Sequence, residues 1–235
     1  GRKELPWRNT NDPYAIYLSE VMLQQTQVKT VLDRYYGPFL EAFPTLEALA
    51  AAPRDALMKA WEGLGYYSRA NNLQRAAQQI MSSRPKRRDL TGSGTLPEDP
   101  GVAVRTGMTL PDDFDALVAL PGIGTNTAHA VLAFAFRKPV AVMEANVKRV
   151  LCRIFALPSP SDKELWALAQ AMVDPANPFD YNQAMMDIGA MVCTKTRPLC
   201  MMCPANTICK GKVAPELYPA PKAKKETPVR RRVIV

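Results

Sequence analysis

Apolar residues recur at the three- and four-residue spacing of an α-helix along most of this chain. The pattern is clear over residues 12–43 and 45–83, and it returns from residue 113 to beyond residue 144. Asp12 followed by Pro13 is typical of a helix start, because the carboxylate can cap an amide and proline needs no amide partner there. Strand-like alternation is confined to the last few residues, so we predict an all-α protein.

Two segments lack any such period. Residues 84–112 are rich in proline, glycine and charge, which predicts a long surface loop inserted between helices. Residues 213–235 begin as a proline- and lysine-rich linker and end in VRRRVIV, whose alternation predicts the first strand of a further domain. We therefore expect a helical part with one insertion, followed by a tail that leads out of it.

Composition narrows the class of protein. The chain has 235 residues, of which 47% are hydrophobic, so it can bury one large core or two smaller ones. No apolar run approaches the roughly 20 residues needed to span a bilayer, and we expect no membrane partner. The net charge of +8 suits a polyanionic partner. Lysines and arginines of the C-terminal tail contribute part of that charge, so it supports nucleic-acid binding only weakly.

The cysteines are grouped near the end of the helical sequence. Four of the five follow the pattern C-x6-C-x2-C-x5-C, at Cys193, Cys200, Cys203 and Cys209. Four thiolates this close together suit a [4Fe–4S] cluster or a structural zinc ion, with chance clustering as the remaining interpretation. The unequal spacings disfavour the paired Cys-x2-Cys arrangement of a zinc ribbon. Cys152 stands apart among apolar residues and is predicted to be buried.

The stretch LPGIGTNTA, residues 120–128, joins two helical segments through a Gly-x-Gly turn. Pro121 ends the first helix, and we expect Gly122 and Gly124 to adopt backbone angles closed to other residues. Such a turn directs N–H groups outward beside the positive N-terminus of the next helix, which makes a seat for a phosphate. A purely structural turn is the alternative. In a basic, all-helical chain the pattern favours a helix-hairpin-helix that binds the DNA backbone.

Six segments of the chain together resemble one family. They are LPWR, SEVMLQQTQV, WEGLGYYSRANNL, LPGIGTNTA, NVKRVL and the four-cysteine loop. Over residues 3–212, apart from the inserted loop, the chain is similar to the catalytic portion of MutY-type adenine DNA glycosylases. These belong to the helix-hairpin-helix superfamily that includes endonuclease III.

The resemblance implies two helical lobes that flank a DNA-binding cleft. Residues 1–137 are expected to form a six-helix barrel that carries the hairpin, and residues 138–212 a lobe in which the four cysteines hold a [4Fe–4S] cluster. The implied partner is double-stranded DNA with a mismatched or oxidised base pair. The implied protein is a monomer of bacterial type, cytoplasmic and associated with the nucleoid.

The resemblance also assigns roles to individual side chains. Glu20 takes the position of the general acid that protonates adenine, and it must keep its proton near neutral pH, for which apolar surroundings are needed. The positions that the family directs to DNA are occupied by Arg8, Gln25, Leu64, Tyr66, Gly122, Gly124 and Asn146. For Leu64 and Tyr66, packing in the core is the alternative, and for Arg8 a surface role.

Two positions depart from the family pattern. Glu144 is the only carboxylate between Asp115 and Asp162, and it stands where the family has an aspartate that stabilises positive charge on the sugar. The extra methylene moves that carboxylate, and a misplacement of ~1 Å can cost ~10²-fold in rate. Asn126 stands where strand-cutting members carry a lysine nucleophile, so we expect no efficient strand cleavage. The alternatives are a solvated surface residue for Glu144 and a helix cap for Asn126.

Together these residues predict an enzyme of base excision repair. The reaction is hydrolysis of the N-glycosidic bond of adenine mispaired with 8-oxoguanine or guanine, without strand cleavage. The departures leave two alternatives, a DNA-binding pseudoenzyme damaged at Glu144 and a glycosylase for uracil or thymine opposite guanine. Glu20 favours the adenine enzyme, since acid catalysis matters most for a purine leaving group.

Overall fold

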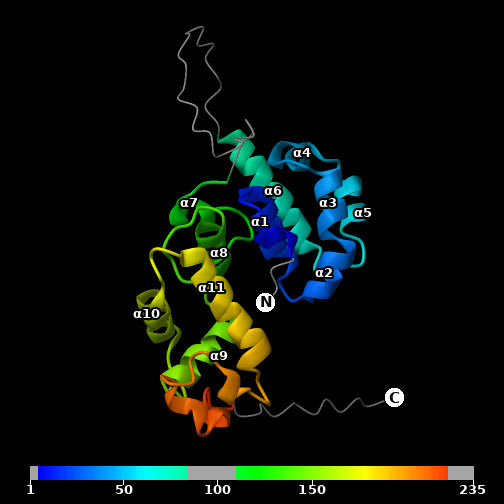
Figure 1. Ribbon diagram of the computed structural model, residues 1–235. Helices are drawn as coiled ribbons and strands as arrows, with labels where there is room; N and C mark the ends of the chain where they lie inside the picture. The colour runs from blue at the N-terminus through cyan, green and yellow to red at the C-terminus, as the bar shows by residue number, and fades with distance from the viewer. Residues whose placement is uncertain (1–4, 84–109, 222–235) are drawn as a thin grey trace, which may run out of the picture. The chain divides into compact units, whose positions relative to one another are not determined.

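The computed structural model describes residues 5–83 and 110–221, and the secondary structure within those ranges is helical throughout (Figure 1). The all-α prediction is therefore confirmed for the described part of the chain. Most of the loop predicted over residues 84–112, and the strand predicted at the C-terminal end, lie outside the described residues. None of the described helices is long and apolar enough to cross a membrane.

The chain is divided into two compact units. The first holds the residues up to Val142 and also Val173–Asn182, and the second holds Met143–Met172 and the residues from Gln183 onward. The chain thus leaves the first unit, builds part of the second, and returns to the first for a short segment. Helical periodicity in the sequence carries no sign of this return.

The first unit is built from short helices around one apolar core. In chain order they are η1 (Pro6–Arg8), α1 (Pro13–Met22), α2 (Val28–Arg34), α3 (Tyr36–Ala42), α4 (Leu46–Ala51), α5 (Arg54–Ala60), α6 (Ser68–Ser82), α7 (Phe114–Val118), α8 (Thr125–Phe134) and the start of α11 (Pro178–Asp187). Aromatic rings fill part of the core: Phe39 lies edge-on to Phe43 and to Trp61, with ring centroids 5.0 and 5.6 Å apart. These contacts hold α3 against the end of α5.

Helix α1 is buried along most of its length, with eight of its ten residues inaccessible to solvent. Asp12 caps it as predicted, because its carboxylate accepts a hydrogen bond from the amide of Tyr14 at 2.9 Å. The phenol of Tyr14 donates to the carbonyl of Phe43 at 2.8 Å. Helices α3, α6 and α8 pack against α1 (Figure 1). Helix α1 is therefore a well-supported platform for the side chains that it carries.

The returning segment completes the first unit. The side-chain oxygen of Asn182 accepts a hydrogen bond from the amide of Val142 at 2.8 Å, and its nitrogen donates to the carbonyl of Val140 at 2.9 Å. Phe179 packs edge-on against Phe134 of α8, with ring centroids 5.6 Å apart. The start of α11 thus holds the chain that follows α8.

The second unit is organised around one amphipathic helix. Its elements are α9 (Ala145–Ile154), α10 (Asp162–Met172), the end of α11, the π-helix η2 (Ile188–Val192) and the 3-10 turns η3 (Cys200–Met202), η4 (Lys210–Lys212) and η5 (Pro215–Leu217). Helix α9 packs against α10, η2 and η4. The amide of Cys193 bonds to the carbonyl of Ile188 at 2.6 Å, so η2 ends at the first cysteine of the predicted cluster.

Candidate functional site

The Gly-x-Gly turn makes the connection between α7 and α8. Leu120 and Ile123 are both buried and anchor the turn to the core. Gly122 has a φ of +79°, and a side-chain carbon there would lie 2.7 Å from Cβ of Asn72 on α6. Positive φ and close approach both require glycine, so the prediction for Gly122 is confirmed.

Gly124 differs from this expectation. Its φ of −94° is open to any residue, and a side-chain carbon there would meet nothing within 4 Å. The prediction that Gly124 needs a special backbone angle is therefore wrong. Gly124 is the N-cap of α8 and brings no side-chain cap to it. With no side chain in front of the helix, an anion can approach its first amides closely.

Glu20 and Asn126 lie on α1 and α8, two helices that pack together within the first unit. Glu20 is the only charged residue of α1 and stays half-buried on that otherwise buried helix. Asn126 is the second residue of α8 and is also half-buried. The side-chain amide of Gln24 donates to the hydroxyl of Thr127 at 3.4 Å, which links the end of α1 to the start of α8.

Two loops carry residues that were expected to enter DNA. Gln25 follows α1 with a φ of +58°, and Tyr66 precedes α6 with a φ of +48°, a region that residues with side chains rarely adopt. Both side chains are exposed. Leu64, in contrast, is only 6% exposed and belongs to the core, so in this structure it packs as the alternative interpretation proposed. Arg8 is half-buried at the end of η1.

Arg69 was not identified from the sequence, although it lies between these two loops. Its guanidinium is buried and donates hydrogen bonds to both of them. The sequence does hold one signal. Arg69 falls at helical spacing from the buried residues Leu73, Ala76 and Ile80, on the apolar face of α6. A charged residue on such a face needs polar partners that only the folded chain reveals.

Glu144 is the N-cap of α9 and is half-buried, which separates it from an ordinary solvated glutamate. The positive end of the helix favours a negative charge at this position. The side-chain nitrogen of Asn146 donates to Glu144 Oε1 at 3.0 Å, and Asn146 Oδ1 accepts from Arg149 Nη2 at 2.8 Å. The structure therefore brings Glu144 and Asn146 into direct contact.

Arg149, also missed in the sequence, extends this contact to the cysteine loop. Its Nε donates to the carbonyl of Cys193 at 2.8 Å, and its Nη2 donates to the carbonyl of Gly189 at 2.6 Å. A side-chain carbon at Gly189 would lie 2.7 Å from Cβ of Asn146, so glycine is required there. One chain of hydrogen bonds thus runs from Glu144 to the first cysteine.

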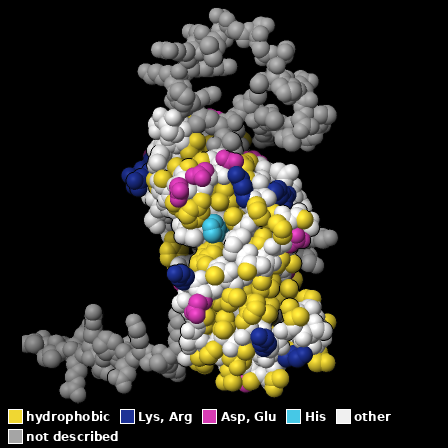
Figure 2. Space-filling model, turned by 90° about the vertical axis from the view of Figure 1, so that its left-hand side faces the viewer, with side chains coloured by type: hydrophobic (Ala, Val, Ile, Leu, Met, Phe, Trp, Pro, Cys, Tyr) yellow, Lys and Arg dark blue, Asp and Glu magenta, His cyan; other side chains and the backbone are white. Residues whose placement is uncertain are grey.

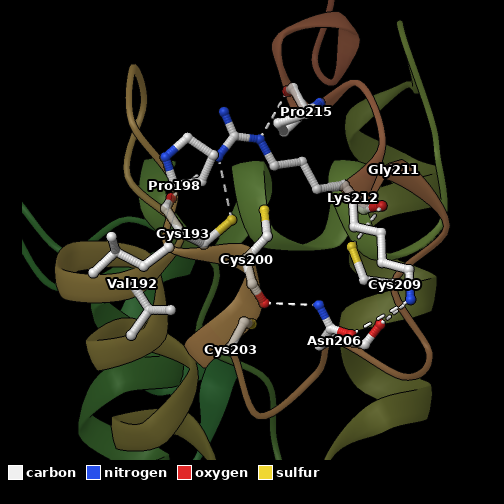
Figure 3. Close-up of a pocket in the computed structure, with 12 residues that line it drawn as sticks. Val192, Cys193, Pro198, Cys200, Cys203, Asn206, Cys209, Gly211, Lys212 and Pro215 are labelled. Atoms are coloured by element: carbon white, nitrogen blue, oxygen red, sulfur yellow. Dashed lines mark hydrogen bonds between the residues drawn. The ribbon is translucent and has the colours of Figure 1, made fainter.

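The four grouped cysteines line one pocket of the second unit (Figure 3). In the close-up the sulfur atoms of Cys193, Cys200 and Cys209 lie around a shared interior space. Burial raises the pKa of the Cys209 thiol, a backbone hydrogen bond from Gly211 lowers it, and the other three thiols raise it further. Four thiols in one pocket would not all ionise without a compensating cation, so the donor set suits a metal centre.

The arrangement of donors bears on the kind of metal centre. Among the described residues, no three or more His, Cys, Asp and Glu side chains are arranged so that they could hold a metal ion as they stand. The four cysteines nevertheless line the same pocket, and a [4Fe–4S] cluster takes one thiolate at each of its four irons.

Arg153 of α9 supports the loop that carries these cysteines. Its buried guanidinium donates to the carbonyls of Thr194 at 2.7 Å and Pro215 at 2.9 Å, which lie near the two ends of the loop. Its Nη1 also lies 3.3 Å from Sγ of Cys193. The positive charge offsets the charge of ionised thiols, which is a second reason that the pocket fits a metal centre. Cys152 of the same helix is buried, as predicted.

Surface charge is a weaker guide. On the face in Figure 2, the Lys and Arg side chains are scattered among hydrophobic and acidic side chains and form no large patch. The described residues hold as many Lys and Arg as Asp and Glu, so the net charge of +8 comes from residues outside the described ranges. Net charge is therefore a weak indicator of function for the described residues, and a function has to be inferred from the local sites.

Comparisons with known proteins agree with this arrangement. Residues 18–175 match the family described as HhH-GPD superfamily base excision DNA repair protein. An adenine DNA glycosylase of Homo sapiens is 40% identical over 224 residues, which cover 90% of this chain and 37% of the relative. An adenine DNA glycosylase of Buchnera aphidicola subsp. Baizongia pistaciae (strain Bp) is 34% identical over 221 residues, which cover 93% of this chain and 56% of the relative. The chain thus spans between about a third and somewhat more than half of the length of these relatives.

The fold agrees with a solved structure as well. A thermostable thymine-DNA glycosylase superposes with a TM-score of 0.74 at 27% sequence identity, over 89% of this chain and 88% of that one. The family match covers more than half of the chain and includes Glu20, the hairpin and Glu144. The chain belongs to the HhH-GPD superfamily of base excision DNA repair proteins.

Proposed function

We propose that this chain is the catalytic part of a DNA glycosylase that removes adenine mispaired with 8-oxoguanine or guanine. The observation that carries the proposal is Glu20, the single charged residue of α1, held half-buried on a helix that is otherwise buried. Identity of 40% and 34% to adenine DNA glycosylases supports the same substrate class. The reaction breaks the N-glycosidic bond and leaves the sugar in the strand.

Glu20 is the general acid in this proposal. Adenine leaves readily only after a ring nitrogen has been protonated, so an un-ionised carboxyl group must donate a proton to the base. Packing of α1 against α3, α6 and α8 holds the helix that carries this carboxyl group. The base must leave the helical stack to reach it, as in other enzymes that act on a base.

Glu144 has the complementary role at the sugar. Departure of the base leaves positive charge on the sugar, and a carboxylate beside it stabilises that charge. Asn146 holds Oε1 of Glu144 by a hydrogen bond of 3.0 Å, which reduces the freedom of the long side chain. Glu144 therefore supplies the required negative charge. Its side chain is one methylene longer than the family's aspartate, so the glycosylase rate is expected to be lower than with aspartate at this position.

Asn126 decides whether the strand is also cut. A lyase reaction needs an amine that forms a Schiff base with the opened sugar. Asn126 offers an amide at this position of α8, and an amide is not a nucleophile of that kind. We therefore propose a monofunctional glycosylase.

Two further features support this function: the hairpin, which is suited to the DNA backbone, and the four cysteines of the second unit. Gly122 sets the turn and Gly124 leaves the N-terminus of α8 open, so the hairpin is suited to a phosphate of the backbone. We infer that a [4Fe–4S] cluster is held by Cys193, Cys200, Cys203 and Cys209. When bound, the cluster cross-links the loop at four points and fixes its shape.

A second candidate function is favoured by one observation. The solved structure with a TM-score of 0.74 is a thymine-DNA glycosylase, so excision of thymine or uracil opposite guanine belongs to the same test. A pyrimidine leaves without needing the same protonation, and Glu20 would then matter less. The response to loss of Glu20 therefore separates the two functions.

The test is a single-turnover assay on duplexes with adenine opposite 8-oxoguanine, adenine opposite guanine, uracil opposite guanine and thymine opposite guanine. We expect release of adenine without strand cleavage. Glu20→Gln should nearly abolish it, because no proton reaches the base. Glu144→Gln should be equally severe, while Glu144→Asp should raise the rate by about 10- to 100-fold if misplacement is the main defect. Glu41→Gln, on an exposed position of α3, is the matched control and should leave the rate unchanged.

Three outcomes would each change this proposal in a different way. Release of thymine or uracil but not adenine would replace the substrate. Tight binding of duplexes without release of any base, in the wild-type chain and in Glu144→Asp, would identify a DNA-binding pseudoenzyme. Full activity in Glu144→Gln would remove Glu144 from the mechanism.

A further inference from the structure

The guanidinium of Arg69 joins two segments that are far apart in the sequence. Arg69 is the second residue of α6 and is only 8% exposed. Its Nη1 donates to the carbonyls of Val21 at 3.0 Å and Met22 at 2.9 Å, and also to that of Gln24. These carbonyls lie at the C-terminal end of α1 and just beyond it, where the partial negative charge of a helix favours a cation.

The other nitrogen of the same fork reaches the second segment. Nη2 donates to the carbonyl of Leu64 at 3.3 Å and to that of Gly65 at 3.2 Å. It also donates to the hydroxyl of Thr26 at 3.2 Å, back in the first segment. The indole nitrogen of Trp61 donates to the carbonyl of Gly65 at 3.1 Å, which supports this segment from a second side.

The two segments are the ones that carry Gln25 and Tyr66. Both residues have positive φ, and such backbone strain persists only where surrounding bonds over-determine it. The bonds from Arg69 flank Gln25 on either side and end immediately before Tyr66. The guanidinium also lies 5.5 Å from the centre of the Tyr66 ring, which places a cation over an exposed aromatic side chain.

We propose that Arg69 is a positioning residue that holds the Gln25 loop (residues 23–27) and the Tyr66 loop (residues 62–67) in fixed relation before DNA binds. The inference rests on the proposed function, because the use of the clamp is to present both side chains to a duplex. Loops that are already ordered lose less freedom on binding, so the clamp increases affinity for DNA.

The proposal requires arginine and not only positive charge. The planar guanidinium has five N–H donors in a fixed fork, whereas the ammonium of lysine is a compact point with three. Arg69→Lys therefore keeps the charge but cannot bond both segments at once. Thr26→Val is a milder second variant that removes one acceptor of the fork and leaves Arg69 intact.

The first measurement is amide hydrogen exchange of the chain without DNA. Arg69→Lys should speed exchange in both loops, by about tenfold, because both lose bonds to a charged donor. The Thr26→Val substitution lies in the Gln25 loop, but it should speed amide exchange in the Tyr66 loop as well. Ile80→Val removes a buried methyl from the same α6 and controls for general loss of stability, and it should leave both loops unchanged.

The second measurement is a double-mutant cycle on binding to a duplex with adenine opposite 8-oxoguanine. Gln25→Ala should weaken binding by about tenfold in the wild-type background and by less than about threefold when Arg69→Lys is present. Gly124→Ala, in the hairpin, should weaken binding by the same factor in both backgrounds.

The clamp is established if amide exchange changes in both loops and if the effects of Gln25→Ala and Arg69→Lys on DNA binding are non-additive, while those of Gly124→Ala and Arg69→Lys are additive. Exchange that changes only in the loop carrying the substitution overturns it, and so does additive binding for Gln25. A wild-type chain that binds no duplex would refute the proposed function. The exchange measurement, which uses no DNA, would still decide whether Arg69 couples the loops.

Discussion

The two glycines of the hairpin allow one prediction to be worked out from the structure. Gly122→Ala introduces a methyl at a φ of +79°, and left-handed backbone costs an L-residue about 1–2 kcal/mol. The same methyl would lie 2.7 Å from Cβ of Asn72, whereas carbons normally approach to about 3.5–4.0 Å. Asn72 must therefore move, and overpacking of this kind costs about 1–3 kcal/mol. Gly122→Ala should destabilise the chain by about 2–5 kcal/mol in all.

Gly124→Ala is the matched comparison two residues away. Its φ of −94° suits alanine, and the added methyl meets nothing within 4 Å. Alanine restricts the unfolded chain, which contributes about 0.4–1 kcal/mol of stability, but it is a poorer N-cap than glycine by a similar amount. The two effects should nearly cancel. The methyl would nevertheless stand in front of the first amides of α8 and should weaken binding to all duplexes alike.

The assay is thermal and denaturant unfolding of the two variants, followed by DNA binding. At roughly 2–4 °C per kcal/mol for a domain of this size, Gly122→Ala should lower the melting temperature by about 4–20 °C. Gly124→Ala should move it by no more than a few degrees and still lose affinity. Equal loss of stability in both variants would refute the reasoning, since only Gly122 combines positive φ with a close neighbour. A loss of affinity limited to adenine mismatches would show that the hairpin reads bases and not phosphates.

Two further predictions concern the cysteine pocket and the single histidine. Purified protein should be brown and contain about four irons per chain, and a colourless protein with one zinc would contradict the inferred cluster. Burial lowers the pKa of His129, with partial opposition from a hydrogen bond to the backbone of Ala141, so the unfolded chain takes up a proton more readily than the folded one. Stability should therefore be lost as the pH falls below the ordinary histidine value of about 6.5, and denaturant midpoints should show a smaller loss in His129→Gln.

The sequence predicted those features that depend on residues close together in the chain. Helical periodicity was sufficient for the all-α fold, and Asp12 caps α1 because a cap is decided within one turn. The pocket could be anticipated for the same reason, since its four cysteines are separated by short loops. The role of Glu20, which also depends on chemistry at a bound substrate, stays a prediction.

Features that depend on distant neighbours could not be predicted. Gly122 and Gly124 look alike in the sequence, but positive φ and the approach of Asn72, some 50 residues earlier, make only Gly122 indispensable. Leu64 and Tyr66 lie in the same short loop, but one packs in the core and the other is 61% exposed. Arg69 looks like an ordinary helix residue, although its partners lie as far as 48 residues away.

The return of Val173–Asn182 to the first unit has a consequence for how the protein folds as it is synthesised. A nascent chain that has emerged only as far as Val142 lacks Asn182, which bonds to Val140 and Val142, and Phe179, which covers Phe134. At about 5–20 residues per second, those partners follow roughly 2–8 s later. During that interval the end of α8 and the residues after it are uncovered. The first unit therefore cannot be completed until Met143–Met172 of the second unit has been synthesised.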